Sequence, residues 1–179
     1  YWEMAFLDPK HVIRSFDVSE GMQVGDFGAG TGAYAFALSE KVGTTGRVYA
    51  IDVQKDLLSK LQNEAKRQRL QNIELVWSDF EKENGVKLRD GIFHRALVAN
   101  VMFQLHDKAP FLSELKQLNR PGGKILVIDW ADSYGNMGPT SEHIFSELTA
   151  KKVFADAGFV FEDFNDAGAH HWGLIFKRP

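Results

Sequence analysis

The chain has 179 residues, with 21 Lys and Arg against 24 Asp and Glu, 16 Gly and no Cys. No run of 18 apolar residues occurs, so no membrane-spanning helix is expected. The lack of Cys excludes disulfides, thiolate metal sites and a Cys nucleophile, and it fits a reducing, cytoplasmic compartment. The net charge of −3 gives no general attraction to nucleic acid. Length and glycine content indicate one compact α/β domain over residues 1–179.

Apolar runs alternate with segments of helical periodicity along the chain. A short helix is expected first, at residues 8–16, inside an N-terminal cover of residues 1–20 that carries no signal-peptide pattern. The period-2 and apolar runs predict strands at residues 22–27, 47–52, 73–77, 93–99, 124–130, 159–164 and 170–176. The 3.6-residue periodicity predicts helices at 31–42, 54–69, 107–118 and 146–157, with Asp107 as a helix cap.

This alternation predicts a parallel sheet with helices on both faces. The last two strands break the pattern, because the loop between them is too short for a crossover connection. They are therefore expected to form an antiparallel hairpin at one edge of the sheet.

A glycine-rich loop joins the first strand to the following helix, with the sequence Asp26-Phe27-Gly28-Ala29-Gly30-Thr31-Gly32. Glycines let the backbone turn sharply and let a ligand come close, and the helix N-terminus offers free N–H groups to an anion. Asp52 ends the next strand, where a carboxylate can accept hydrogen bonds from both hydroxyls of a ribose. The pair predicts a cofactor that carries a nucleoside.

The type of cofactor follows from the charge and spacing of this loop. The glycines follow G-x-G-x-G, whereas dinucleotide sites have G-x-G-x-x-G. Asp26 would also place a negative charge beside a pyrophosphate, which disfavours a nicotinamide dehydrogenase. S-adenosylmethionine has no phosphate, and its carboxylate and ammonium suit the helix end and Asp26 respectively. S-adenosylmethionine is therefore the expected cofactor.

Residues 24–32 resemble the first motif of class I S-adenosylmethionine-dependent methyltransferases. Further segments resemble that family in the same order, at residues 49–52, 77–80, 99–102 and 118–124, so the resemblance covers essentially the whole chain. The order of segments is similar to small enzymes of methyltransferase type 11, of the ubiquinone and menaquinone biosynthesis kind. Arsenite methyltransferases are also similar, but their Cys set is absent. The resemblance implies a Rossmann-like, doubly wound seven-stranded sheet of order 3-2-1-4-5-7-6, with strand 7 antiparallel.

The resemblance also implies which residues bind S-adenosylmethionine. The family's acid after strand 3 contacts the adenine amino group, and the segment after strand 4 borders the methionine part. The expected cofactor-binding residues are Asp26, Gly28, Ala29, Gly30, Thr31, Gly32, Asp52, Val53, Ser78, Asp79, Phe80, Asn100 and Val101. One position departs from the family, since His94 stands where strand 4 usually carries Asp. That position supports packing and local hydrogen bonds, so no effect on the cofactor is expected.

Methyl transfer from a sulfonium is an in-line displacement, so the protein mainly has to orient the acceptor. A base is needed only when the acceptor loses a proton. Side chains near the carboxyl ends of strands 4 and 5 are the candidates for catalysis: His106, Asp129 and His143. A packed loop histidine and a loop cap are the alternative interpretations of His106 and Asp129. No metal site is expected, because consecutive strand residues such as 170 and 171 point to opposite faces.

The acceptor is expected to be a small molecule, because the cofactor-binding fold uses almost all of the chain. The glycine-containing loop at residues 131–145 is the expected acceptor loop, and Trp2, Phe6 and Leu7 are expected to line the site. Two alternatives stay open. One is a methyltransferase acting on tRNA or another nucleic acid, and the other is a non-catalytic S-adenosylmethionine-binding module. A monomer or a homodimer is expected.

Overall fold

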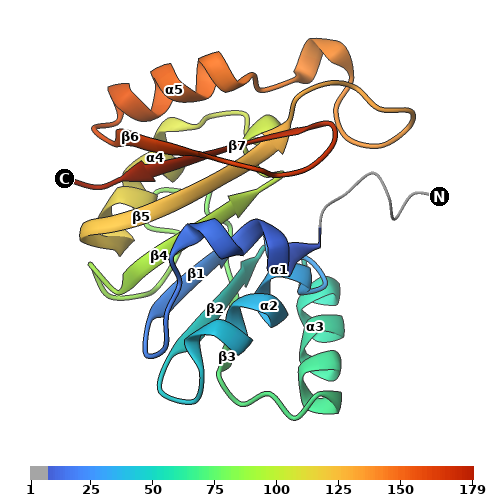
Figure 1. Ribbon diagram of the computed structural model, residues 1–179, viewed down its shortest axis with the longest axis vertical. Helices are drawn as coiled ribbons and strands as arrows, with labels where there is room; N and C mark the ends of the chain where they lie inside the picture. Colours follow the sequence, from blue (N-terminus) through green and yellow to red (C-terminus); the bar gives the residue numbers. More distant parts are fainter. Residues whose placement is uncertain (1–7) are drawn as a thin grey trace.

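The computed structural model describes residues 8–179, so the expected roles of Trp2, Phe6 and Leu7 lie outside the described residues. Seven strands form one sheet of order β3-β2-β1-β4-β5-β7-β6, which confirms the order expected from sequence (Figure 1). β7 runs antiparallel to both β5 and β6. The strands are β1 (Gln23–Phe27), β2 (Arg47–Asp52), β3 (Ile73–Trp77), β4 (Phe93–Ala99), β5 (Asn119–Trp130), β6 (Val160–Asn165) and β7 (His171–Lys177).

The helices alternate with the first strands, as expected. The α-helices are α1 (Pro9–Val12), α2 (Ala33–Val42), α3 (Lys55–Arg67), α4 (Ala109–Leu118) and α5 (Glu147–Asp156). Short 3-10 turns are η2 (Ile13–Phe16), η3 (Met102–Gln104) and η4 (Ser141–His143). No helix within residues 8–179 is long and apolar enough to cross a membrane.

Hydrophobic clusters fill both faces of the sheet. One cluster contains the apolar side chains of α4 and α5, and the other contains those of α1, η2 and α2. β5 contributes to both, with Ile125 and Val127 in the first cluster and Leu126 and Ile128 in the second. Burial on both faces explains why this strand is a continuous apolar run instead of an alternating one. Figure 1 shows α1 and α2 in front of the sheet and α4 behind it.

Several element ends differ from the sequence prediction for identifiable reasons. α2 begins after Gly32, whose φ of 103° is left-handed and cannot continue a helix. α3 ends before Arg69, which is also left-handed with a φ of 57°. The N-cap of α4 is Lys108, not Asp107, although the Asp107 carboxylate still accepts a hydrogen bond from the Ala109 N–H at 3.1 Å.

The sheet order creates the crevice in which a ligand can lie. From β1 the chain proceeds outward through β2 to β3, and from β4 it proceeds the other way through β5. The connections that follow β1 and β4 therefore diverge to opposite sides, and a crevice opens at the carboxyl ends of these two neighbouring strands. The glycine-rich loop follows β1 directly and lies at this point.

Candidate active site

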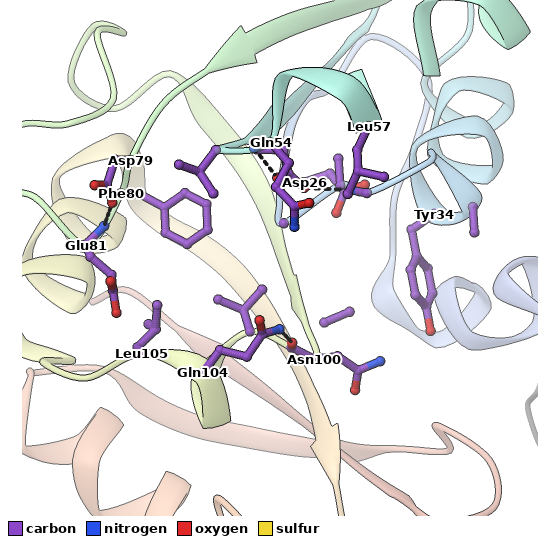
Figure 2. A pocket seen from close by; sticks show the side chains of 18 residues that line it. Asp26, Tyr34, Gln54, Leu57, Asp79, Phe80, Glu81, Asn100, Gln104 and Leu105 are labelled. Carbon is purple, nitrogen blue, oxygen red and sulfur yellow. Dashed lines mark hydrogen bonds between the residues drawn. The ribbon is translucent and has the colours of Figure 1, made fainter. Parts of the chain in front are cut away.

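A cavity of about 460 Å³, called the crevice cavity below, lies at the carboxyl ends of β1, β2 and β4 (Figure 2). Most of the residues expected to bind the cofactor line it. These are Asp26, Gly28, Ala29, Gly30, Asp52, Val53, Asp79, Phe80, Asn100 and Val101. The structure thus brings together side chains and loops from four separate segments of the sequence.

Three expected cofactor residues do not line this cavity. Thr31 is exposed, and Gly32 is buried at the N-cap of α2, where a Cβ would come within 2.8 Å of the Phe36 ring. The Ser78 hydroxyl donates a hydrogen bond to the Gly85 carbonyl at 2.6 Å, which closes the loop after β3. These residues shape the loops that line the cavity.

Sequence reasoning missed other residues of the lining: Ala33, Tyr34, Gln54, Leu57, Glu81, Ala99, Gln104 and Leu105. Several lie at the start or in the first turn of the helices that follow β1 and β2. Their position just after the glycine loop or Asp52 could have identified them, because the first turn of a helix that follows a ligand-binding loop faces the ligand. The others come from the loops after β3 and β4, where residue type gave no indication.

The Asp52 carboxylate is held in place by two backbone groups. Its Oδ2 accepts a hydrogen bond from the Gly30 N–H at 2.9 Å, and its Oδ1 accepts one from the Gln54 N–H at 2.9 Å. Asp52 is only 6% exposed. Each oxygen keeps a further lone pair, so the carboxylate can still accept hydrogen bonds from ligand hydroxyls in the cavity.

Asp26 is a buried carboxyl that lines the cavity without a partner for one oxygen. It is 2% exposed, and its Oδ2 has no hydrogen bond to any described residue. Burial first, and then the nearby charge of Asp52, raise the pKa of Asp26 to about 7. The Asn100 Oδ1 is likewise buried and without a partner. Two unsatisfied acceptors on one cavity fit a ligand that carries an ammonium group.

Tyr34 stands on the first turn of α2 and lines the same cavity (Figure 2). Burial, followed by the charge of Asp26, raises the pKa of the Tyr34 phenol to about 12. The phenol therefore stays protonated at neutral pH and is available as a hydrogen-bond donor.

Two glycines of the loop are required for different reasons. Gly28 has a φ of +74°, and a Cβ there would come within 2.5 Å of Val101 Cγ2. Gly30 has a φ of +57°, yet a Cβ there would meet nothing within 4 Å. Gly28 is thus needed to pack the loop against the turn after β4. Gly30 leaves open space on the cavity side, where a ligand can approach the backbone.

A second cavity of about 600 Å³ lies beside the crevice cavity and shares Gln104 and Leu105 with it. Its other lining residues are Phe103, His106, Lys108, Pro139, Thr140, Glu142, His143, Ile144 and Phe145. The structure therefore brings His106 and His143 to one cavity, although they are far apart in sequence. The His143 Nδ1 is hydrogen-bonded to the Thr140 hydroxyl at 2.7 Å. The end of the 131–145 loop forms one wall of this second cavity.

Asp129 is placed beneath the turn that separates the two cavities and lines neither of them. Its side chain is completely buried. Its Oδ2 accepts a hydrogen bond from the Phe103 N–H at 3.1 Å, and its Oδ1 accepts one from the Trp130 N–H at 2.8 Å. Burial raises the pKa of Asp129 to about 6. This geometry suits a residue that fixes the turn.

The other histidines considered at the sequence level make local contacts. His94 Nδ1 accepts a hydrogen bond from the Gln23 N–H at 2.9 Å, and His94 lines neither cavity. His170 pairs through Nδ1 with Asp132 at 2.8 Å, and the His171 ring packs on Trp130 at 4.3 Å. Within residues 8–179, no group of three His, Asp or Glu side chains is placed to hold a metal ion.

Comparison with known proteins shows the family to which the chain belongs. Residues 18–173 match the family described as a methyltransferase domain. The chain belongs to this methyltransferase domain family. S-adenosylmethionine is the methyl donor that the family implies, and the class I Rossmann-like fold is the one expected from sequence.

Solved methyltransferase structures share this fold over most of their length. A SAM-dependent methyltransferase from Aquifex aeolicus superposes with a TM-score of 0.87 and 31% identity, covering 97% of this chain and 90% of that one. A putative type 11 methyltransferase from Sulfolobus solfataricus gives a TM-score of 0.77 at 24% identity, covering 97% of this chain and 93% of that one. At that identity, the Sulfolobus protein supports the fold alone.

Curated relatives are longer than this chain. A demethylmenaquinone methyltransferase from Staphylococcus aureus (strain MRSA252) is 30% identical over 123 residues, which are 67% of this methyltransferase domain and 48% of the relative. Another from Geobacillus sp. (strain WCH70) is 25% identical over 117 residues, or 65% of this chain and 49% of the relative. The chain therefore spans about half the length of the curated relatives it matches.

Proposed function

We propose that the protein transfers a methyl group from S-adenosylmethionine, bound in the crevice cavity, to a small molecule bound in the second cavity. One observation carries this proposal: the two cavities share a wall made by Gln104 and Leu105. Donor and acceptor must meet for an in-line displacement, and adjoining cavities allow this contact.

The described residues fit the donor at each of its functional groups. S-adenosylmethionine supplies a methyl group that is activated by its sulfonium sulfur. Asp26 and Asn100 each have a buried oxygen free to accept a hydrogen bond from the donor's ammonium group. Asp52 keeps lone pairs for the ribose hydroxyls, and Asp79 lies on the loop after β3, where it can accept from the adenine amino group. The carboxyl groups of Asp26, Asp52 and Asp79 all line this cavity, and their negative charge disfavours the binding of a pyrophosphate.

The second cavity fits a small aromatic acceptor. Its volume lies in the range of small-molecule sites, and the rings of Phe103 and Phe145 provide apolar surface. His106 and His143 supply polar groups that can contact the acceptor and take its proton, if methylation releases one. Asp129 contributes by holding the turn between the cavities. The relatives named for demethylmenaquinone make a naphthoquinol the first acceptor class to test.

The test measures donor binding and methyl transfer separately. Titration calorimetry with S-adenosylhomocysteine should show binding, and the tritiated methyl group of S-adenosylmethionine should appear on 1,4-naphthalenediol. Replacing Phe145 by Ala should reduce transfer and leave donor binding unchanged, because this ring lines only the second cavity. No heat with S-adenosylhomocysteine from folded protein would refute the donor site.

Two other results would redirect the acceptor assignment. Methylation of tRNA, together with a tRNA gel shift that weakens with salt, would indicate a nucleic-acid acceptor. Donor binding without transfer to any small molecule or tRNA would favour a binding module without catalysis.

A further inference from the structure

The segment of residues 101–106, called the partition below, separates the two cavities. Gln104 and Leu105 line both of them, and His106 lines the second cavity. The partition is fixed on the sheet side, where the Phe103 N–H donates to Asp129. A segment that belongs to both cavities can transmit a change in one of them to the other.

Glu81 fixes the partition from the side of the crevice cavity. It lies on the loop after β3 and lines the crevice cavity together with Asp79 and Phe80. Its Oε1 accepts a hydrogen bond from the His106 N–H at 2.9 Å, while its own N–H donates to Asp79 Oδ1 at 3.2 Å. Figure 2 shows the Glu81 carboxylate pointing from its loop toward Leu105, and a dashed line marks the hydrogen bond from the Glu81 N–H to Asp79.

The geometry points to Glu81 as a positioning residue that couples the occupancy of the two cavities. This inference rests on the proposed function, because it takes the crevice cavity as the donor site. Phe80 precedes Glu81 and Leu105 precedes His106, and both line the crevice cavity. A bound donor contacts both segments that the Glu81–His106 hydrogen bond joins. The donor therefore stabilises the position of His106 in the second cavity.

The coupling has a thermodynamic consequence that can be measured from either side. A donor that orders the partition raises the affinity for an acceptor, and the acceptor must raise the donor affinity by the same factor. Couplings of this kind are typically about 5- to 150-fold. The coupling in this protein is expected at the low end of that range, because the second cavity is partly exposed and one hydrogen bond joins the two segments.

A simpler role for Glu81 is to fasten two surface segments without any coupling. In that case, removing the carboxylate would lower stability or donor affinity, and the acceptor would still change the donor affinity as in the unmodified protein. The ratio of donor affinities with and without an acceptor therefore separates the two roles.

The experiment measures the dissociation constant of S-adenosylhomocysteine by calorimetry, with and without saturating 1-naphthol as an acceptor-like probe. In the unmodified protein, 1-naphthol should lower the dissociation constant of S-adenosylhomocysteine about fivefold. Glu81→Ala should reduce this effect to less than about twofold. Glu81→Gln should restore most of it, because the amide oxygen can still accept from the His106 N–H.

The matched control is Glu83→Ala, which removes an exposed carboxylate from the same loop and should keep the full effect. Thermal melting of each variant shows that it is folded. Unchanged coupling in Glu81→Ala, or no coupling in the unmodified protein, would overturn the inference while leaving donor binding intact. Failure of S-adenosylhomocysteine to bind the unmodified protein would instead refute the proposed function.

Discussion

At the scale of single residues, we expect Asp26 to set how donor binding depends on pH. Its pKa is raised to about 7 by burial and then by Asp52, so the carboxyl is half protonated near neutrality. Only the ionised form can pair with the donor's ammonium group. We expect S-adenosylhomocysteine affinity to rise up to about tenfold between pH 6 and pH 8, since each pH unit below a pKa lowers the ionised fraction tenfold.

Calorimetry across this pH range checks the prediction. Asp26→Asn should bind more weakly and lose most of the pH dependence. Glu83→Gln, which replaces an exposed carboxylate, serves as the control, and its donor affinity should vary with pH as in the unmodified protein. An Asp26→Asn profile as steep as that of the unmodified protein would contradict the role of this carboxyl.

Asp52 provides a second prediction for a single side chain. Its two oxygens accept the Gly30 and Gln54 N–H groups, and both would lose their partner in Asp52→Ala. We expect donor affinity to fall by about 1–3 kcal/mol, the usual cost of leaving polar groups unpaired. Asp56→Ala removes an exposed acid from the first turn of α3 and should leave the donor affinity unchanged. Equal donor affinities of the two variants would show that Asp52 does not contact the ribose.

Single residues also show how far the sequence could predict the site. Asp26, Asp52 and Gly28 could be predicted because their chemistry and spacing are distinctive. Gln104 and Leu105 could not, because an amide and an aliphatic side chain are common everywhere and become site residues only through the position of the partition. Asp129 was expected to act in catalysis at the end of β5. Its burial beneath the partition depends on the packing of η3, which the sequence pattern does not contain.

At the scale of elements, the glycine loop depends on the turn after β4. In Gly28→Ala, the new Cβ would lie 2.5 Å from Val101 Cγ2 and would also force a left-handed backbone on Ala. Gly122→Ala imposes similar strain at a φ of +79°, with nothing within 4 Å. We expect Gly28→Ala to lower the free energy of unfolding by about 2–5 kcal/mol and Gly122→Ala by about 1–2 kcal/mol.

Urea unfolding of both variants measures the difference, and calorimetry measures donor binding. Gly28→Ala should weaken the binding of S-adenosylhomocysteine. Gly122→Ala should leave that affinity unchanged, because Gly122 lies outside the crevice cavity. Equal losses of stability would indicate that the loop can move away from Val101.

Elements were predicted better than their ends. Strands β2, β3 and β4 have the predicted bounds because apolar runs between polar turns define them directly. Helix ends depend on which residue leaves the helical conformation. Arg69 is left-handed although it is not Gly, so residue type gave no signal for the end of α3.

At the scale of the whole molecule, buried carboxyls determine how stability changes with pH. Burial raises the pKa values of Asp26, Asp129 and Glu114. A raised pKa means that the folded state binds protons more tightly than the unfolded chain. These groups therefore stabilise the protein fully below about pH 4, and that contribution is lost as pH rises toward 7. Burial lowers the pKa values of His94 and His171, so the folded state favours their neutral rings. Near pH 6 these two residues therefore add stability as pH rises, which opposes the trend of the carboxyls.

The contribution of Asp26 can be isolated by comparing variants. Raising its pKa from 3.8 to about 7 corresponds to an upper limit on the order of 4 kcal/mol between pH 4 and pH 8. In the absence of donor, the free energy of unfolding of the unmodified protein relative to Asp26→Asn should fall by a few kcal/mol over this range. Urea titrations at pH 4, 5, 6, 7 and 8 measure that difference, with Glu83→Gln as the control. A constant difference would show that Asp26 has the same pKa in the folded and unfolded states, and its pairing with an ammonium group would then need no change of charge near neutrality.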